Sequence, residues 1–361
     1  MAGVTVGILN DMADPAPGPG DIGEWLEREV QALQNAGRID FPVNFAFAYG
    51  LGLPSGTSEA VETAYRQLVD AGAGMIVGPA IGDNALVVTP LAEQLRVPTI
   101  NWAGAERARG RWMFQLQVGS HEDESLLIAR HLAAIGASEI GVVHDRSVIG
   151  TRHFKCLQDE ARVLGLEIVA AEGISPLGED AGVLTQTVLK SRPEAFVYLG
   201  LGLSAPATAA VLKEAGWTGP KIMNTAGLRG YHGDFAQALD GWLYLDLVSD
   251  DNRTLHRLLA ETAMDMTQAP AVARGHDLGR VIAEALARAP DKSRDGLRLG
   301  LERVKWLPAA QGREGTLLGF GVCDRGALHG RYLVMRQWQD GVSREIAGNL
   351  HMDGAYPPLR G

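Results

Sequence analysis

Short apolar runs alternate with amphipathic stretches over most of this 361-residue chain, and this alternation constrains the fold more than any other feature. Residues 4–9 are rich in β-branched residues, and residues 22–35 place apolar side chains at helical spacing. Strands separated by helices of ten or more residues form βαβ units. The sequence therefore predicts an α/β fold with parallel sheets covered by helices on both faces. We expect strands at 4–9, 43–49, 75–77, 99–101, 140–143, 168–171, 196–199, 221–223 and 242–248, and helices at 22–35, 58–71, 84–95, 122–135, 150–164, 182–190 and 207–215.

The alternation falters at two places, near residues 116–120 and 248–252. From 254 to 303 the pattern is nearly all helical, and a length of 361 residues suits two domains. A chain that builds one lobe, crosses to a second and returns gives two discontinuous domains. The sequence predicts two Rossmann-like lobes joined by three linking strands, with a first lobe of 1–118 plus 249–315 and a second of 119–248 plus 316–361.

The bulk composition excludes several classes of function. A formal net charge of −10 argues against nucleic acid or an anionic membrane surface as a partner. No run approaches the roughly 18 apolar residues that span a bilayer, so we expect no membrane insertion. Two distant cysteines, Cys156 and Cys323, favour free thiols over a disulfide framework or a thiolate metal cluster. The nine histidines show no metal-ligand spacing, and we expect neither a metal nor a cofactor.

The N-terminus leaves the compartment open. Met1, Ala2 and Gly3 lead directly into the first strand, whereas a signal peptide needs a basic segment, a longer apolar run and a cleavage site. Two interpretations remain: the mature form of an exported protein, or a cytoplasmic protein that starts at Met1.

Residues 322–341 predict a β-hairpin. Asp324–Gly326 forms one bend and His329–Gly330 a second. The apolar residues Tyr332, Val334 and Met335 then supply a strand, which Gln337, Trp338 and Gly341 close.

This stretch resembles the C-terminal hairpin of the type I periplasmic solute-binding proteins, the family of the branched-chain amino-acid-binding protein. The resemblance extends over nearly the whole chain. It implies a non-enzymatic, monomeric protein that traps a small molecule between two lobes by hinge closure. Such a protein presents its ligand to the membrane subunits of an ABC importer and works in the periplasm or another extracytoplasmic space.

Ligands of open α/β sheets bind where loops converge at the carboxyl ends of the strands. In the first lobe, the backbone amides of a helix beginning near Asp83 would suit an anionic or carbonyl oxygen, although the segment also fits a plain turn capped by Asp83 or Asn84. Trp102 fits either a pocket floor or the core. In the second lobe, Arg229 fits either a bidentate contact with a carboxylate or a solvated surface position. The candidate ligand-binding residues are Ala80, Ile81, Gly82, Trp102, Ala103 and Gly104 in the first lobe and Ile149, Leu201, Gly202, Leu203, Asn224, Ala226 and Arg229 in the second. His276 and Asp277, which we expect to open a helix at 278–289, occupy the family's Tyr-Asp position, often a structural one.

The resemblance also bears on the ligand. Amino-acid-binding relatives carry serine or threonine hydroxyls where this chain has Gly82 and Gly104, and an acidic residue that pairs with the ligand ammonium where it has Ala226. A tyrosine of the relatives is Ile149 here. A buried, unpaired ammonium costs several kcal/mol. We therefore expect an apolar or aromatic carboxylate rather than an α-amino acid.

Two other functions compete with this one. A cytoplasmic ligand sensor of the same fold, similar to amide-sensing regulators, would explain the missing signal peptide. A nicotinamide-dependent oxidoreductase would use the G-x-G-x-x-G match at Gly18–Gly23, but residues 10–17 separate this match from the strand and Pro19 removes a backbone donor. Ser204 also lacks the closing glycine of a nucleophile elbow. We therefore expect no enzyme.

Overall fold

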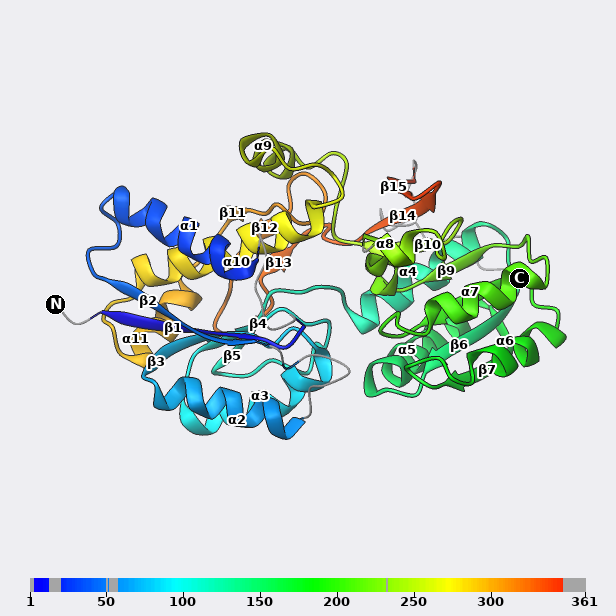
Figure 1. The fold of residues 1–361 in the computed structure, drawn as a ribbon, viewed down its shortest axis with the longest axis horizontal. Helices are drawn as coiled ribbons and strands as arrows, with labels where there is room; N and C mark the ends of the chain where they lie inside the picture. The colour runs from blue at the N-terminus through cyan, green and yellow to red at the C-terminus, as the bar shows by residue number, and fades with distance from the viewer. Residues whose placement is uncertain (1–2, 13–20, 50, 52–57, 232, 347–361) are drawn as a thin grey trace. The chain divides into compact units, whose positions relative to one another are not determined.

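The computed structural model describes residues 3–12, 21–49, 51, 58–231 and 233–346 and divides the chain into two compact units (Figure 1). Unit 1 comprises residues 1–118 and 251–332, and unit 2 comprises 119–250 and 333–361. Residues 316–332 therefore belong to unit 1, although the sequence analysis placed them in the second lobe. The reason is that they form part of a small antiparallel sheet with residues 307–308. Residues 18–20 of the glycine motif lie outside the described residues.

Unit 1 is built on a five-stranded parallel sheet with the order β2-β1-β3-β4-β5. In Figure 1, α1 and α10 lie on one face of this sheet and α2 and α3 on the other. A small antiparallel sheet, β11-β12-β13, completes the unit. The elements are β1 (Val4–Asn10), α1 (Ile22–Asn35), β2 (Val43–Tyr49), α2 (Ser58–Asp70), β3 (Ala73–Val77), α3 (Gly82–Leu95), β4 (Thr99–Asn101), β5 (Met113–Gln115), α9 (Arg253–Thr262), α10 (Ala269–Arg288), α11 (Arg294–Glu302), β11 (Leu307–Pro308), β12 (Leu317–Leu318) and β13 (Leu328–His329).

Unit 2 is built on a seven-stranded sheet with the order β15-β14-β10-β9-β8-β6-β7. Its strands β6 to β10 are parallel, and β14 and β15 extend the sheet in antiparallel fashion. Helix α4 packs against α5, and α6 packs against α7. The elements are α4 (His121–Ala134), β6 (Glu139–Asp145), α5 (Val148–Leu164), β7 (Glu167–Ile174), α6 (Ala181–Lys190), β8 (Ala195–Leu199), α7 (Ala205–Glu214), β9 (Lys221–Met223), the 3₁₀ helix η1 (Thr225–Tyr231), α8 (Gly233–Ala236), β10 (Leu243–Asp246), β14 (Val334–Gln339) and β15 (Val342–Glu345).

The two units share one topology. The order β7-β6-β8-β9-β10 repeats the order β2-β1-β3-β4-β5. In each sheet the first strand in the sequence is an inner strand, the second lies on one side of it, and the following strands are added on the other side. This change of side lies between β1 and β3 in unit 1 and between β6 and β8 in unit 2. Ligands of doubly wound sheets bind at the carboxyl ends of the strands that flank such a switch point. The predicted α/β fold with parallel sheets in two lobes is confirmed.

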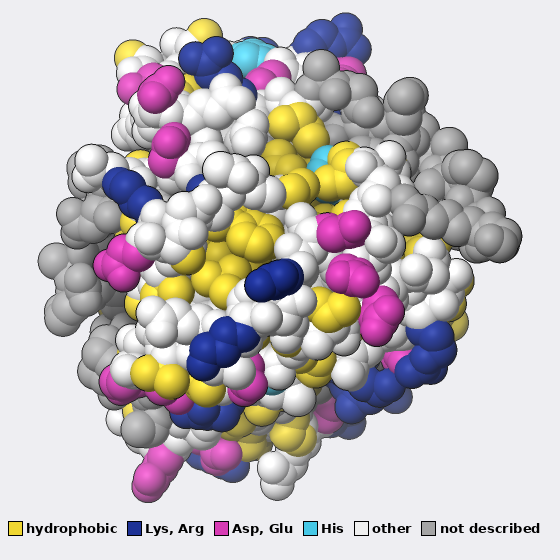
Figure 2. Space-filling model, turned by 90° about the vertical axis from the view of Figure 1, so that its right-hand side faces the viewer, with side chains coloured by type: hydrophobic (Ala, Val, Ile, Leu, Met, Phe, Trp, Pro, Cys, Tyr) yellow, Lys and Arg dark blue, Asp and Glu magenta, His cyan; other side chains and the backbone are white. Residues whose placement is uncertain are grey.

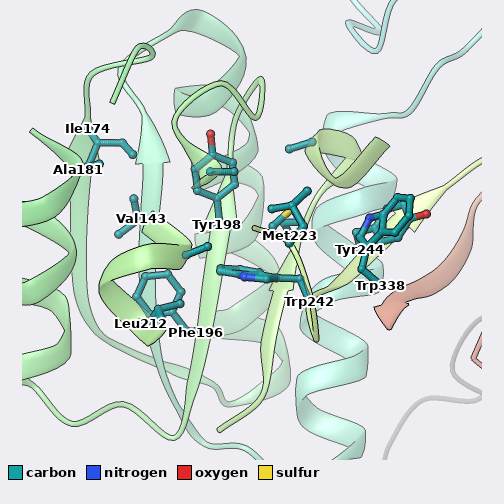
Figure 3. Packing of buried hydrophobic residues seen from close by; sticks show 14 of the residues in the cluster. Val143, Ile174, Ala181, Phe196, Tyr198, Leu212, Met223, Trp242, Tyr244 and Trp338 are labelled. Atoms are coloured by element: carbon teal, nitrogen blue, oxygen red, sulfur yellow. The ribbon is translucent and has the colours of Figure 1, made fainter. Parts of the chain in front are cut away.

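Each unit has its own apolar core. In unit 2, the side chains of Phe196, Trp242 and Met223 pack together against the sheet, and the indole of Trp338 stacks on Tyr244 (Figure 3). In unit 1, Tyr65 and Leu68 of α2 pack with Ile76 of β3. On the face of the molecule in Figure 2, apolar side chains gather near the centre, with acidic and basic side chains around them. None of the helices in the described ranges is long and apolar enough to cross a bilayer.

Two local predictions were wrong. The C-terminal hairpin comprises β14 and β15 rather than residues 322–341, and it turns at Asp340 and Gly341, whose positive φ angles of 52° and 76° fit a tight type I′ turn. His276 and Asp277 lie in the middle of α10 rather than at a helix start, because α10 begins at Ala269 with a proline in its first turn. The Asp277 carboxylate accepts the amides of Ala310 and Gln311, so its role is structural, and burial raises its pKa to about 6.

Candidate functional site

In unit 1, a buried carboxylate holds the loop at the switch point. Asp11 follows β1 directly and is fully buried. Its oxygens accept the backbone amides of Ala80 and Ile81 at 2.6 and 3.2 Å and the side-chain amide of Asn84 at 2.7 Å. Burial raises the pKa of Asp11, and these hydrogen bonds oppose the rise. The amides of Ala80 and Ile81, two of the candidate ligand-binding residues, are therefore bonded to the protein's own carboxylate.

The start of α3 also differs from the expected turn. The helix begins at Gly82, and Ile81 occupies the N-cap position without a side-chain hydrogen bond, so neither Asp83 nor Asn84 caps it. Within the described part of the chain, the buried Oδ1 of Asp83 has no hydrogen-bond partner, and burial raises the pKa of this carboxyl. The first turn of α3 thus presents Gly82 beside an acidic group rather than a simple anion site.

The loop after β4 is packed into the core. Trp102 is 4% exposed, and its amide donates to the carbonyl of Pro79 at 3.1 Å. Ala103 is buried in a small alanine cluster with Ala85, and Gly104 is partly exposed. Trp102 and Ala103 therefore act mainly as packing residues in this structure.

In unit 2, a second buried carboxylate occupies the equivalent place. Asp145 ends β6 and is fully buried. It accepts the amide of Leu201 at 2.7 Å, the hydroxyl of Ser204 at 2.7 Å and the hydroxyl of Tyr198 at 3.0 Å. Burial raises the pKa of Asp145. Burial also raises the pKa of Tyr198, and the negative charge of Asp145 raises it further. Figure 3 shows Tyr198 extending from β8 with its hydroxyl away from the apolar cluster.

Asn224 joins three elements behind this loop. Its side chain accepts the amide of Gly200 at 3.2 Å and donates to the carbonyl of the same residue at 3.0 Å. It also lies 3.1 Å from Nε2 of His153, which is buried in α5. Burial and the neighbouring His121 lower the pKa of His153 well below its usual value. Asn224 is thus a structural residue that fixes the loop after β8.

Arg229 combines burial with donors that the protein does not use. It lies in η1, and its Nε donates to the carbonyl of Leu201 at 2.6 Å. Its guanidinium lies 5.9 Å from the ring centre of Phe235. Burial lowers its pKa, and the nearby Tyr198 and Asp145 oppose this. Among the described residues, no hydrogen bond or ion pair engages its Nη1 and Nη2.

Gly202 allows this arrangement. Its φ of +86° is in the left-handed region, and a Cβ there would lie 2.9 Å from the Ala226 carbonyl and 3.0 Å from Cδ of Arg229. Leu201 and Leu203 beside it are partly exposed, whereas Ala226 and Ile149 are buried at 5% and 7% exposure. In unit 2 the structure therefore brings Arg229, Leu201 and Gly202 together and places Ala226 under them.

A buried network supports η1 from below. The carboxylate of Asp246 accepts the hydroxyls of Tyr231 and Tyr244 at 3.0 and 2.8 Å. The indole of Trp338 donates to the Gly227 carbonyl at 2.9 Å and packs edge-on against Tyr231. Arg336 lies 3.9 Å from Asp246. The segment that carries Arg229 is thus held by β10 and β14.

No group of three or more His, Cys, Asp or Glu side chains capable of holding a metal occurs within the described ranges.

The comparisons with known proteins agree with this geometry. A family model described as periplasmic binding protein matches residues 55–339. This chain belongs to the periplasmic binding protein family. The family comprises solute-binding proteins rather than enzymes, and its type I members have the fold described above. A search of curated proteins found no match.

Solved structures show the same fold at low sequence identity. A type 1 periplasmic binding protein from Bordetella pertussis Tohama I has a TM-score of 0.80 and 14% identity, over 96% of this chain and 100% of that one. An ABC transporter substrate-binding protein from Desulfitobacterium hafniense in complex with Leu has a TM-score of 0.75 and 16% identity, over 96% and 100%. A leucine-binding protein from Thermotoga maritima has a TM-score of 0.75 and 15% identity, over 95% and 98%.

Sequence reasoning missed the residues that organise the two loops of this periplasmic binding protein. Asp145 is the last residue of β6, and Asp11 directly follows β1. A carboxylate at the end of an apolar strand is unusual, and this could have marked both residues in the sequence. Their partners lie 53 to 73 residues away, so the pairing can be recognised only in the folded structure. His153 gave no signal, because its helix reads as an ordinary amphipathic one.

Proposed function

We propose that this periplasmic binding protein binds a small apolar or aromatic carboxylate without an α-ammonium group and delivers it to an ABC importer. The observation that carries the proposal is Arg229, a partly buried guanidinium with both Nη groups unused by the described residues. A guanidinium binds a carboxylate through two parallel N–H donors. The hinge closure and monomeric state that the resemblance implies are part of the proposal.

The surroundings of Arg229 favour an apolar ligand body. Leu201 and Leu203 flank Gly202, and the ring of Phe235 lies beside the guanidinium. An ion pair in such surroundings is less screened by water than one at the surface. A carboxylate attached to an apolar or aromatic group would satisfy both the charge and the side chains.

The carboxylates near the candidate loops of unit 2 are already bonded, which disfavours a ligand ammonium there. Asp145 accepts three donors, and Asp246 accepts two tyrosine hydroxyls and two backbone amides. Glu124 accepts the amides of Ser120 and Thr225, each at 2.7 Å. An ammonium placed here would compete with these internal bonds instead of meeting a waiting carboxylate.

Unit 1 contributes mainly shape to this proposal. The amides of Ala80 and Ile81 are used by Asp11, and Trp102 and Ala103 are buried. Gly82 and Gly104 remain as positions at which a ligand approaches the backbone closely. We propose contacts of this kind in unit 1 and the charged contact in unit 2.

A thermal-shift and calorimetric comparison of acids and amino acids tests this function. The probes are 4-methylpentanoate, benzoate and cyclohexanecarboxylate, with L-leucine as the α-amino counterpart of the first. We expect at least one acid to stabilise the protein more than L-leucine, and Arg229→Ala to weaken that acid by about 30-fold, equivalent to about 2 kcal/mol. Arg229→Lys should recover part of the loss, because it keeps the charge without the fork. Arg162→Ala, at an exposed arginine of α5, is the matched control.

Cell fractionation tests the periplasmic location. With its native gene, we expect the protein in the fraction released by osmotic shock. Retention with a cytoplasmic marker would favour the sensor hypothesis without changing the binding result.

A further inference from the structure

Unit 1 has a cavity on the side of its sheet opposite the candidate ligand loops. It measures about 650 Å³ and is lined by residues that precede β5, by the end of α11 and by residues 322–325. These segments lie at the amino ends of the parallel strands, whereas residues 80–82 and 102–104 follow the carboxyl ends. The cavity is therefore distinct from the loops discussed above. Its lining comprises Arg109, Gly110, Arg111, Arg298, Glu302, Val322, Cys323, Asp324 and Arg325.

The lining is strongly basic in a protein that is acidic overall. Four arginines and two carboxylates give the cavity a net charge of +2, against −10 for the whole chain. Glu302 is committed to the protein, because it accepts Arg298 at 2.5 Å and Arg325 at 2.7 Å. The remaining positive charge belongs to Arg109 and Arg111, so the cavity attracts anions.

Two of the arginines form a rigid wall. Arg325 donates to the carbonyls of Gly110, Gly321 and Arg111 at 2.9 to 3.3 Å, and its guanidinium lies 4.4 Å from the Phe114 ring centre. Arg298 lies 5.3 Å from the ring centre of Trp112. A site whose walls are held by such contacts loses little side-chain entropy when a ligand binds.

Donors remain available inside this wall. Arg298 is 9% exposed, and its buried Nε has no hydrogen-bond partner in the described part of the chain. The nearest carboxylate oxygen, Oδ1 of Asp295, is 4.0 Å away. Arg109 uses only Nε, which donates to Gln115 at 2.5 Å, and the exposed side chain of Arg111 bonds to none of the described residues. The Nη groups of Arg109 and Arg111, which the described residues do not use, are therefore the donors open to an anion.

We propose that this cavity is a second binding site, for a small phosphate-bearing anion with two or more negative charges. A volume of about 650 Å³ is within the range of small-molecule sites. Phosphate groups suit the cavity because each presents several acceptor oxygens to guanidinium forks, and a dianion matches the net charge of +2. Arg109 and Arg111 close on the anion, while Arg298 and Arg325 shape the wall.

Calorimetry with inorganic pyrophosphate tests the site. We expect binding by the wild-type protein, about tenfold weaker binding after Arg111→Ala or Arg109→Ala, and no change after Arg66→Ala, at an exposed arginine of α2. Arg111 is exposed, so its replacement leaves the fold intact. Equal affinities in the wild type and the Arg109→Ala/Arg111→Ala double variant, or no binding at about 10 mM pyrophosphate, would overturn the proposal.

The exposed thiol of Cys323 in the lining gives a local readout. In a Cys156→Ser background, pyrophosphate should slow the alkylation of Cys323 by iodoacetamide, and this protection should be lost in the double variant. Alkylation that is insensitive to bound pyrophosphate would place the anion elsewhere and overturn the assignment. Tricarballylate is the carboxylate arm: binding as tight as that of pyrophosphate would overturn the phosphate specificity.

Discussion

The two units solve the same structural problem with different chemical groups. In each unit, a buried aspartate at the carboxyl end of the first strand, β1 or β6, holds the loop after the neighbouring strand, β3 or β8. In unit 1 the partners of Asp11 are two backbone amides and the side chain of Asn84. In unit 2 the partners of Asp145 are one backbone amide and the hydroxyls of Ser204 and Tyr198.

The difference has a consequence for ligand binding. Backbone amides can only donate, and in the loop of unit 1 the amides of Ala80 and Ile81 already donate to Asp11. Hydroxyls both donate and accept, and the loop of unit 2 also carries Arg229, whose Nη groups are unused by the described residues. Two units of one topology thus leave different chemistry at equivalent places: in unit 1 a loop whose backbone donors are bonded to Asp11, and in unit 2 a loop that carries the guanidinium of Arg229.

The largest expected effect comes from neutralising the two aspartates. Asp145→Asn should lower the free energy of unfolding by about 1 kcal/mol. The new side-chain amide can donate to the hydroxyls of Ser204 and Tyr198, and its oxygen still accepts the backbone amide of Leu201. Asp11→Asn should cost about 3 kcal/mol, because one amide of Ala80 or Ile81 must then face a donor. Urea unfolding measures both.

Asp40→Asn, at an exposed aspartate, is the control and should change the free energy of unfolding by less than about 0.5 kcal/mol. Equal costs at positions 11 and 145 would mean that the hydroxyl partners do not adapt, and the contrast between the units would fail.

Gly202→Ala should lower the free energy of unfolding by about 2 kcal/mol. The backbone at this position is left-handed, and the added Cβ would lie 2.9 Å from the Ala226 carbonyl. The same change at Gly178 isolates the conformational part. Its φ is +84°, but the nearest atoms to a Cβ are at 3.4 Å, so we expect about 1 kcal/mol. Urea unfolding again provides the measurement, and a smaller loss at Gly202 than at Gly178 would contradict the crowding.

Removing one hydroxyl should affect unit 2 more than unit 1. Tyr198→Phe deprives Asp145 of a donor and the Gly202 amide of its acceptor, which should cost about 1–2 kcal/mol. Tyr65→Phe removes only a bond to Thr99, whose hydroxyl still donates to Val97, and should cost less than about 1 kcal/mol. Melting temperatures measured side by side would show the order, and a larger loss for Tyr65→Phe would refute it.

In unit 2, a pH effect should arise at His153. The pKa of His153 is held well below 6.5 in the folded state, so the unfolded chain binds more protons below pH 6.5. Stability should therefore fall as pH drops below about 6.5, and His153→Gln should flatten this dependence. Melting temperatures between pH 7.5 and 5 give the slope. Identical slopes for both proteins would exclude His153 as its source.

Much of the fold could be predicted because its elements are local. The bounds predicted for β2 and α1 match the structure, since each is set by periodicity, with Asp21 capping α1. Strand β5 was missed because three residues carry no period. The hairpin was placed too early, although Asp340-Gly341 is the stronger turn signal.

The site was harder to predict because its partners are distant in sequence. The sequence predicted the loops after the strands, but it did not show which hydrogen-bond donors in these loops are already bonded within the protein. The use of the Ala80 and Ile81 amides depends on Asp11, about 70 residues earlier, and the setting of Arg229 depends on Leu201. Pattern analysis identifies where loops end and begin, whereas only the folded structure shows which donors are left for a ligand.

The most direct test of the central claim is to titrate the ligand-stripped protein with 4-methylpentanoate and with L-leucine, which differ only by the α-ammonium group. Isothermal calorimetry of the wild type and Arg229→Ala measures both affinities. The account predicts tighter binding of the acid than of L-leucine, and loss of the acid's affinity in Arg229→Ala. Tighter binding of L-leucine, or an acid that binds equally well without Arg229, would contradict it.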